Sequence, residues 1–126
     1  MKKIYFLIIL LITVIISCKN LESNKKDFIC KNGSKRISVE MENGQDFLIY
    51  DKVIKTNFVC KNVDPVGLLI QGAGIRLVGS KDKNIMRTEI KVPSNYLEKD
   101  TLTIMVRYGE NYKKECEFNI PIKESE

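Results

Sequence analysis

From residue 28 onward, apolar and polar residues alternate with a period of two, and this pattern limits the possible folds more than any other feature of the chain. Successive side chains of a β-strand point to opposite faces, so a strand with one buried face shows this alternation. The clearest runs cover residues 37–41, 54–60, 85–92, 101–108 and 113–122. Short segments rich in Gly, Asn, Asp and Pro separate them, as in tight turns. The sequence therefore predicts an all-β domain.

Two segments carry a different pattern. Residues 66–70 are almost continuously apolar, which favours a central strand buried on both faces. Residues 94–97 follow Pro93 and are expected to form one helical turn between two strands. Seven to nine short strands in about 95 residues are typical of an antiparallel β-sandwich. A small β-barrel is the alternative architecture.

The first 18 residues have the pattern of an export signal. Lys2 and Lys3 form a short positive region, and residues 4–16 follow as an almost entirely apolar run. A helix that spans the membrane needs about 20 such residues, whereas the apolar region of a signal peptide needs about 7–15. The run ends in the tetrapeptide Ile-Ile-Ser-Cys at residues 15–18.

This tetrapeptide resembles the lipobox of bacterial lipoproteins, in which an aliphatic and a small residue precede an obligatory cysteine. The resemblance implies a signal peptide at residues 1–17, which is removed by cleavage, and lipid attached to the thiol and the freed amine of Cys18. Two or more acyl chains anchor a protein stably, at about 0.8 kcal/mol per buried methylene. The alternative is an uncleaved signal anchor in which Cys18 is incidental.

The expected organisation follows from these two parts of the chain. Residues 19–27 are polar and are expected to form a flexible tether together with the acylated Cys18, so that the tether covers residues 18–27. Residues 28–126 are expected to form a single all-β domain.

A second resemblance covers residues 46–122. The segments NFVCKNVDP at 57–65, LLIQG at 68–72 and DTLTIMV at 100–106 are similar to bacterial immunoglobulin-like domains, as in periplasmic proteins of the gliding-motility and type IX secretion machinery. The resemblance implies an immunoglobulin-like β-sandwich. The chain contains no tryptophan, so the buried packing residue of antibody-type domains is missing.

Three cysteines remain besides Cys18. An exported chain meets an oxidising compartment in many bacteria, so one disulfide and one left-over thiol are expected. Strand parity places Cys60 and Cys116 toward the core, and the pair Cys60–Cys116 is therefore favoured over a pair that uses Cys30. The alternative is that all three stay free as small buried apolar side chains.

The chain contains no histidine, which excludes Ser-His-Asp and Cys-His nucleophile activation and removes the usual zinc ligand. The segment Gly72-Ala73-Gly74 begins like a dinucleotide-binding loop, but Leu77 stands where the third glycine belongs, so a turn is expected. We expect no catalytic residue, no cofactor and no metal, and we expect that the protein is not an enzyme.

The formal net charge of +5 includes Lys2 and Lys3 and is spread along the chain, so nucleic-acid binding is not expected. The expected function is that of a lipid-anchored protein of the bacterial cell envelope, held on a membrane through Cys18, with its domain on the exported side, periplasmic or surface. It would act as a non-catalytic protein-binding or structural module for another envelope protein. The alternative is an envelope lipoprotein that inhibits an enzyme or carries a small apolar ligand.

Overall fold

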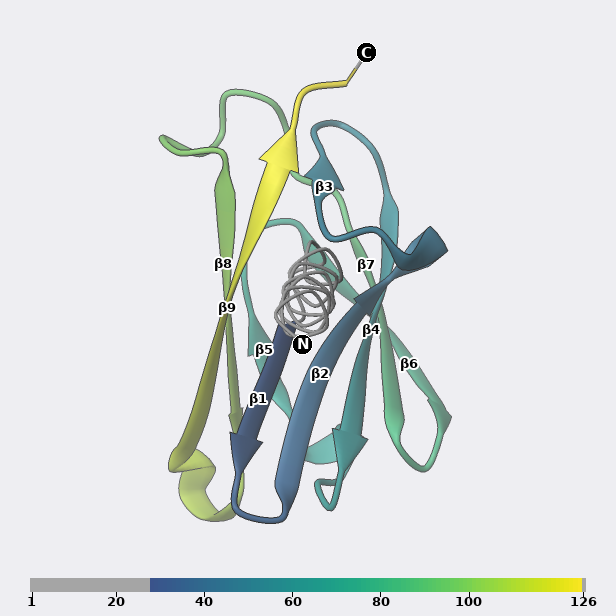
Figure 1. Cartoon of the computed structure of the whole chain (residues 1–126), viewed down its shortest axis with the longest axis vertical. Helices are drawn as coiled ribbons and strands as arrows, with labels where there is room; N and C mark the ends of the chain where they lie inside the picture. The colour runs from purple at the N-terminus through teal and green to yellow at the C-terminus, as the bar shows by residue number, and fades with distance from the viewer. Residues whose placement is uncertain (1–27, 126) are drawn as a thin grey trace, which may run out of the picture.

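The computed structural model describes residues 28–125 (Figure 1). The expected signal peptide, Cys18 and the tether lie outside these residues. The described strands are β1 (Phe28–Asn32), β2 (Lys35–Met41), β3 (Leu48–Ile49), β4 (Ile54–Lys61), β5 (Leu69–Gln71), β6 (Ile75–Asp82), β7 (Ile85–Ile90), β8 (Thr101–Tyr108) and β9 (Lys114–Lys123). Three short 3-10 turns join some of them: η1 (Glu42–Gly44), η2 (Pro65–Gly67) and η3 (Glu110–Tyr112).

The strands form two sheets that pack face to face (Figure 1). The five-stranded sheet is antiparallel and has the order β1-β2-β4-β7-β6, and the four-stranded sheet has the order β3-β9-β8-β5. In the second sheet β3 runs parallel to β9, and the other pairs are antiparallel. The prediction of an all-β, immunoglobulin-like sandwich is thus confirmed. A small barrel is excluded because each sheet has two edge strands, whereas a closed barrel has none.

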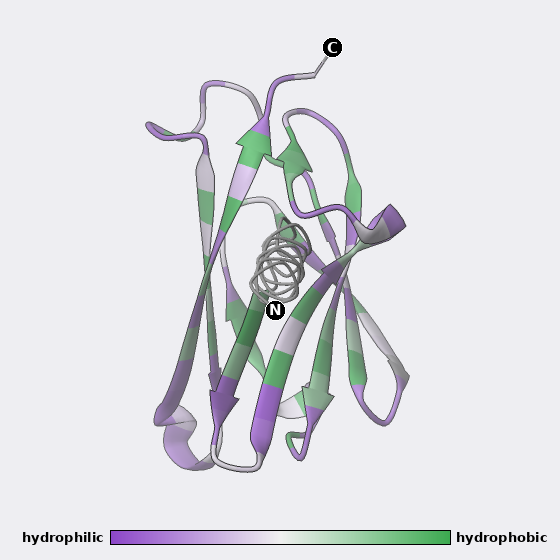
Figure 2. Cartoon of the chain, in the orientation of Figure 1, coloured by the Kyte–Doolittle hydropathy of each residue, from purple (hydrophilic) through white to green (hydrophobic). Residues whose placement is uncertain are grey.

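The core lies between the two inner faces, where alternate residues of each strand are buried. Figure 2 shows the alternation along the strands. The residues that are less than 2% exposed are Phe58, Ile37, Leu48, Ile54, Ile90, Leu102, Ile104, Ile120, Val92, Val106, Thr56 and Thr88. The Thr88 hydroxyl donates a hydrogen bond to the Thr56 carbonyl at 2.7 Å, so this buried polar group is satisfied.

The prediction of a central strand at residues 66–70 is wrong. Only Leu69–Gln71 form a strand, β5, at the edge of the four-stranded sheet, and the Val66 side chain is 71% exposed. The Asp64 carboxylate accepts a hydrogen bond from the Val66 backbone N–H at 3.0 Å, and Pro65 opens the 3-10 turn. An Asp-Pro pair favours a turn so strongly that it outweighs the apolar run that follows it.

The expected helical turn at residues 94–97 is also absent. Asn95 has a φ of 64°, which a right-handed helical turn does not allow. The Asp51 carboxylate accepts hydrogen bonds from both the backbone N–H and the hydroxyl of Ser94, at 3.1 and 2.8 Å. These bonds hold the segment against the loop before β4 instead.

The expected turn at Gly72-Ala73-Gly74 is confirmed. It carries the chain from β5 in one sheet to β6 in the other, so it closes one side of the sandwich. Gly74 has a φ of +75°, its carbonyl accepts a hydrogen bond from the Lys91 N–H at 2.9 Å, and a Cβ at this position would collide with the Lys91 carbonyl. Only glycine fits this close approach of two backbones.

Candidate functional site

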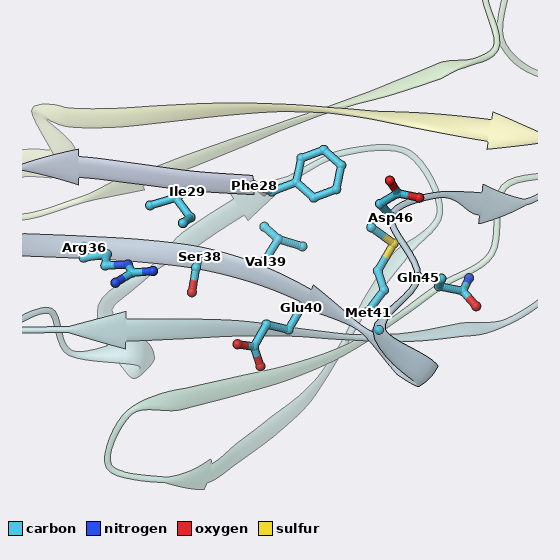
Figure 3. A pocket seen from close by; sticks show the side chains of 10 residues that line it. Phe28, Ile29, Arg36, Ser38, Val39, Glu40, Met41, Gln45 and Asp46 are labelled. Atoms are coloured by element: carbon cyan, nitrogen blue, oxygen red, sulfur yellow. The ribbon is translucent and has the colours of Figure 1, made fainter. Parts of the chain in front are cut away.

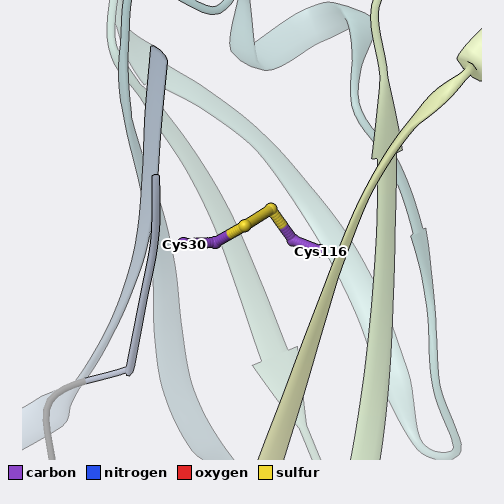
Figure 4. The surroundings of a disulfide bond; sticks show 2 residues. All are labelled: Cys30 and Cys116. Atoms are coloured by element: carbon purple, nitrogen blue, oxygen red, sulfur yellow. A yellow bond between two sulfur atoms is a disulfide. The ribbon is translucent and has the colours of Figure 1, made fainter. Parts of the chain in front are cut away.

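A disulfide joins Cys30 of β1 to Cys116 of β9, with the two Cα atoms 6.0 Å apart (Figure 4). Cys60 is a buried free thiol. The favoured pairing Cys60–Cys116 is therefore wrong, and the alternative that uses Cys30 is right. Cys18, the expected lipidation site, lies outside the described residues.

The order of the strands explains the pairing. Cys30 lies opposite Ile37 of β2, and Ile37 lies opposite Cys60 of β4, so the three residues form one row across the five-stranded sheet. Neighbouring strands are about 4.8 Å apart, which places Cys60 about 10 Å from Cys30. The edge strand β1 packs against β9 and brings Cys30 to Cys116. The disulfide closes the second side of the sandwich and indicates that the domain matures in an oxidising, exported compartment.

Cys60 is poorly suited to nucleophilic chemistry. Its side chain is 3% exposed, and its Sγ lies 4.0 Å from the Phe58 carbonyl oxygen. Burial, and secondly the charge of Asp64, raise the pKa of the Cys60 thiol to about 11. The thiol is therefore protonated at neutral pH, whereas the thiolate is the nucleophilic form.

Polar contacts at the end of the sandwich near residues 50 and 100 hold loops in place. The Tyr50 hydroxyl donates a hydrogen bond to the Asp100 carboxylate at 2.6 Å, and this bond is the main cause that raises the pKa of Tyr50 to about 12. The hydrogen bonds from Ser94 lower the pKa of Asp51. Within residues 28–125, no group of three or more Cys, Asp or Glu side chains could hold a metal ion.

The outer face of the five-stranded sheet carries a different arrangement. Lys31 of β1 lies opposite Arg36 of β2, and Arg36 lies opposite Lys61 of β4. The next row along the strands is the inward-facing row of Cys30, Ile37 and Cys60, in which Ile37 and Cys60 are buried and Cys30 is half-buried, so strand alternation turns the three basic side chains outward. We refer to Lys31, Arg36 and Lys61 as the basic row.

Among residues 28–125, no described carboxylate forms an ion pair with the basic row. Among the described side chains of residues 28–125, the one ion pair joins Arg76 to Glu89, on β6 and β7. Like charges directly opposite each other on neighbouring strands destabilise a sheet. The fold therefore carries a local electrostatic cost at this row, which a bound anion would relieve.

A row of aliphatic side chains lies beside the basic row on the same outer face. Ile29 lies opposite Ser38, Ser38 opposite Val59, and Val59 opposite Ile85, so the row crosses β1, β2, β4 and β7. Ile29 is 39% exposed, whereas Val59 and Ile85 are half-buried. We refer to Ile29, Val59 and Ile85 as the aliphatic row. It is flat, because none of its side chains is more than about two-fifths exposed.

A pocket of about 460 Å³ lies at the β1–β2 edge, and Arg36 of the basic row and Ile29 of the aliphatic row are among its lining residues (Figure 3). Ser38 and Glu40 of the outer face also line the pocket, together with Asp46 and the inward-facing Phe28, Val39 and Met41. The pocket lies beside Phe28, the first described residue of β1, which pairs with Val39 of β2.

The loops beyond the basic row add further polar and aromatic groups. The Asn62 side chain donates a hydrogen bond to the Ser34 carbonyl at 2.7 Å, so the β1–β2 turn lies against the segment after β4. A second hollow of about 280 Å³ is lined by Lys35 and Asn62 on one side and by Tyr108 and Gly109 on the other. Tyr112, which is 53% exposed, follows in η3 with a φ of 53°.

Sequence reasoning missed the basic row. Its members lie at positions 31, 36 and 61, and nothing in this spacing indicates that they meet. They become neighbours only through the antiparallel pairing of β1 with β2 and of β2 with β4. The tight Asn32-Gly33 turn was the one available signal, since it places Lys31 and Arg36 near each other across a hairpin.

Comparisons of the chain with protein-family models, with curated proteins and with solved structures gave no match. Among the described residues, no helix has the length and the apolar character needed to cross a membrane.

Proposed function

We propose that this chain is a lipid-anchored protein of the bacterial cell envelope that binds another protein without catalysing a reaction. The observation that carries the proposal is the basic row, which forms no ion pair with a described carboxylate, next to the aliphatic row on one flat sheet face. Protein-binding surfaces commonly combine an apolar centre with charged groups that direct the partner.

The anchor part of the proposal is supported by the Ile-Ile-Ser-Cys motif at residues 15–18. The Cys30–Cys116 disulfide supports a location on the exported side of the membrane. The proposed binding face is also close to the anchor in the chain, because Ile29 and Lys31 belong to β1, the first strand after the tether. Ten residues from Cys18 to Asp27 span at most about 35 Å, so the face would stay near the membrane.

The alternative, an enzyme inhibitor or a carrier of a small apolar ligand, gains no comparable support. A carrier encloses most of its ligand in a largely apolar cavity. The pocket of about 460 Å³ is open at the β1–β2 edge and is lined by the charged side chains of Arg36, Glu40 and Asp46.

Site-specific photo-crosslinking tests the proposed function. A photoreactive residue would replace Ser38, at the centre of the proposed face, in the full chain expressed in the cells that produce it. The control position is Glu117, which is exposed on β9 and lies on the outer face of the other sheet. We expect a specific cross-linked protein from position 38 and none from position 117. Equal cross-linking from both positions, or none from position 38, would contradict the proposal.

The anchor is tested separately by Cys18→Ser. The substituted chain should take up no labelled fatty acid and should stay as an uncleaved precursor. Normal lipid labelling and maturation of this variant would show that the lipoprotein part of the proposal is wrong.

A further inference from the structure

We propose that the partner binds this face through an acidic segment, with carboxylates over the basic row and aliphatic side chains over the aliphatic row. The inference rests on the proposed function and specifies the chemistry of the partner.

Charge complementarity is the first argument. Lys31, Arg36 and Lys61 are direct cross-strand neighbours and lack an acidic partner among the described side chains. Carboxylates placed over this row would remove the repulsion within it and would form charge-assisted hydrogen bonds. Arg36 can hold a carboxylate in a bidentate manner, and its position in the wall of the pocket leaves room for one.

The spacing of the two rows is the second argument. Two of the three members of the aliphatic row lie two residues from a member of the basic row on the same strand, Ile29 from Lys31 on β1 and Val59 from Lys61 on β4. Two residues along a strand cover about 6.8 Å. An extended partner segment has the same separation between its side chains i and i+2, so an acidic residue followed two positions later by an aliphatic one fits both rows.

The shape of the surface favours a protein over an anionic membrane. Surfaces that insert into a membrane project large apolar side chains such as Trp, Phe and Leu. Here Val59 and Ile85 are half-buried and β-branched, so they expose little apolar surface. Such a face can pack against another flat surface, whereas it offers little to insert among acyl chains.

The test measures binding of a fluorescent peptide to the full mature lipoprotein in neutral detergent micelles. The probe is an extended peptide in which Glu and Val recur at i and i+2, and the matched control peptide has Gln in place of each Glu. We expect the Glu peptide to bind at low ionic strength, the Gln peptide to bind at least about tenfold more weakly, and salt to weaken the binding of the Glu peptide.

The deciding variant combines Lys31→Gln, Arg36→Gln and Lys61→Gln. An exposed ion pair changes affinity by about two- to fivefold, so three of them should together cost about tenfold or more in affinity. The matched control removes three exposed lysines elsewhere, through Lys52→Gln, Lys91→Gln and Lys99→Gln, and should bind the Glu peptide almost as the natural chain does. Thermal melting of both variants checks that each is folded.

The outcomes separate this inference from the proposed function. Equal binding of the Glu peptide by the two triple variants, or no binding by the natural chain, would overturn the acidic-segment inference, while cross-linking from position 38 would still support protein binding. Binding to vesicles of phosphatidylglycerol that the basic-row variant loses, without binding of the Glu peptide, would also overturn the inference and would assign the face to the membrane.

Discussion

Cys30 and Cys60 lie in the same row of the five-stranded sheet, two strands apart, and Cys30 is the one bonded to Cys116. Ile37 separates the two cysteines in that row. Strand parity cannot distinguish them, because every member of such a row faces the same way. The edge position of β1, which packs against β9, decides which cysteine is oxidised and leaves the other as a buried thiol.

Removing this disulfide should lower the free energy of unfolding substantially. The double variant Cys30→Ala, Cys116→Ala should lose about 2–5 kcal/mol of unfolding free energy, because the bond closes a long loop in the unfolded chain. The two cysteines are 86 residues apart. Urea unfolding followed by circular dichroism measures the loss. The control is Cys60→Ala, which removes only one buried sulfur atom and should cost about 1 kcal/mol. A loss no larger than that of the control would show that the bond does not constrain the domain.

The Cys60 thiol should make stability fall at high pH. Burial raises its pKa from 9.0 to about 11 in the folded domain. Between these pH values the unfolded chain loses the thiol proton and the folded chain keeps it, so the free energy of unfolding decreases as the pH rises. Urea unfolding of the natural chain and of Cys60→Ala should therefore diverge between pH 9 and 11, with the natural chain losing more. A difference that does not change with pH would contradict the assigned protonation of Cys60.

The two faces of β8 should respond differently to truncation. Ile104 is fully buried, whereas Met105 is half-buried on the outer face. Ile104→Ala should cost about 2–5 kcal/mol, because it removes core contacts and leaves a cavity. Met105→Ala should cost clearly less when both are measured by denaturant unfolding. Equal costs would mean that the register of β8 is wrong.

Gly74 should not tolerate a side chain. A Cβ at this position would collide with the Lys91 backbone, and its φ of +75° is unfavourable for alanine. We expect Gly74→Ala to lower stability by about 2–4 kcal/mol in thermal or urea unfolding. Gly67→Ala is the matched control, since a Cβ there meets no atom within 4 Å. Similar losses for the two variants would show that β5 and β6 are joined differently.

The strands were largely predictable because the signal for them is local. The segments at 85–92, 101–108 and 113–122 correspond to β7, β8 and β9 within two residues at each end. The prediction of a central strand at residues 66–70 was wrong, because apolar character alone does not distinguish a buried central strand from an exposed turn followed by a short edge strand. The candidate site was not predictable, because cross-strand neighbours depend on which strands pair and in which register.

The alternation of side chains along each strand was determined by the sequence alone. Ile104 points inward and Met105 outward because the pleat of a strand sends neighbouring residues to opposite faces whatever lies beside it. The tertiary structure alone decided that Cys30 meets Cys116 and that Lys31, Arg36 and Lys61 share one row. Strand order and register are set by the packing of the whole core, so residues distant in the chain become neighbours only when the two sheets have assembled.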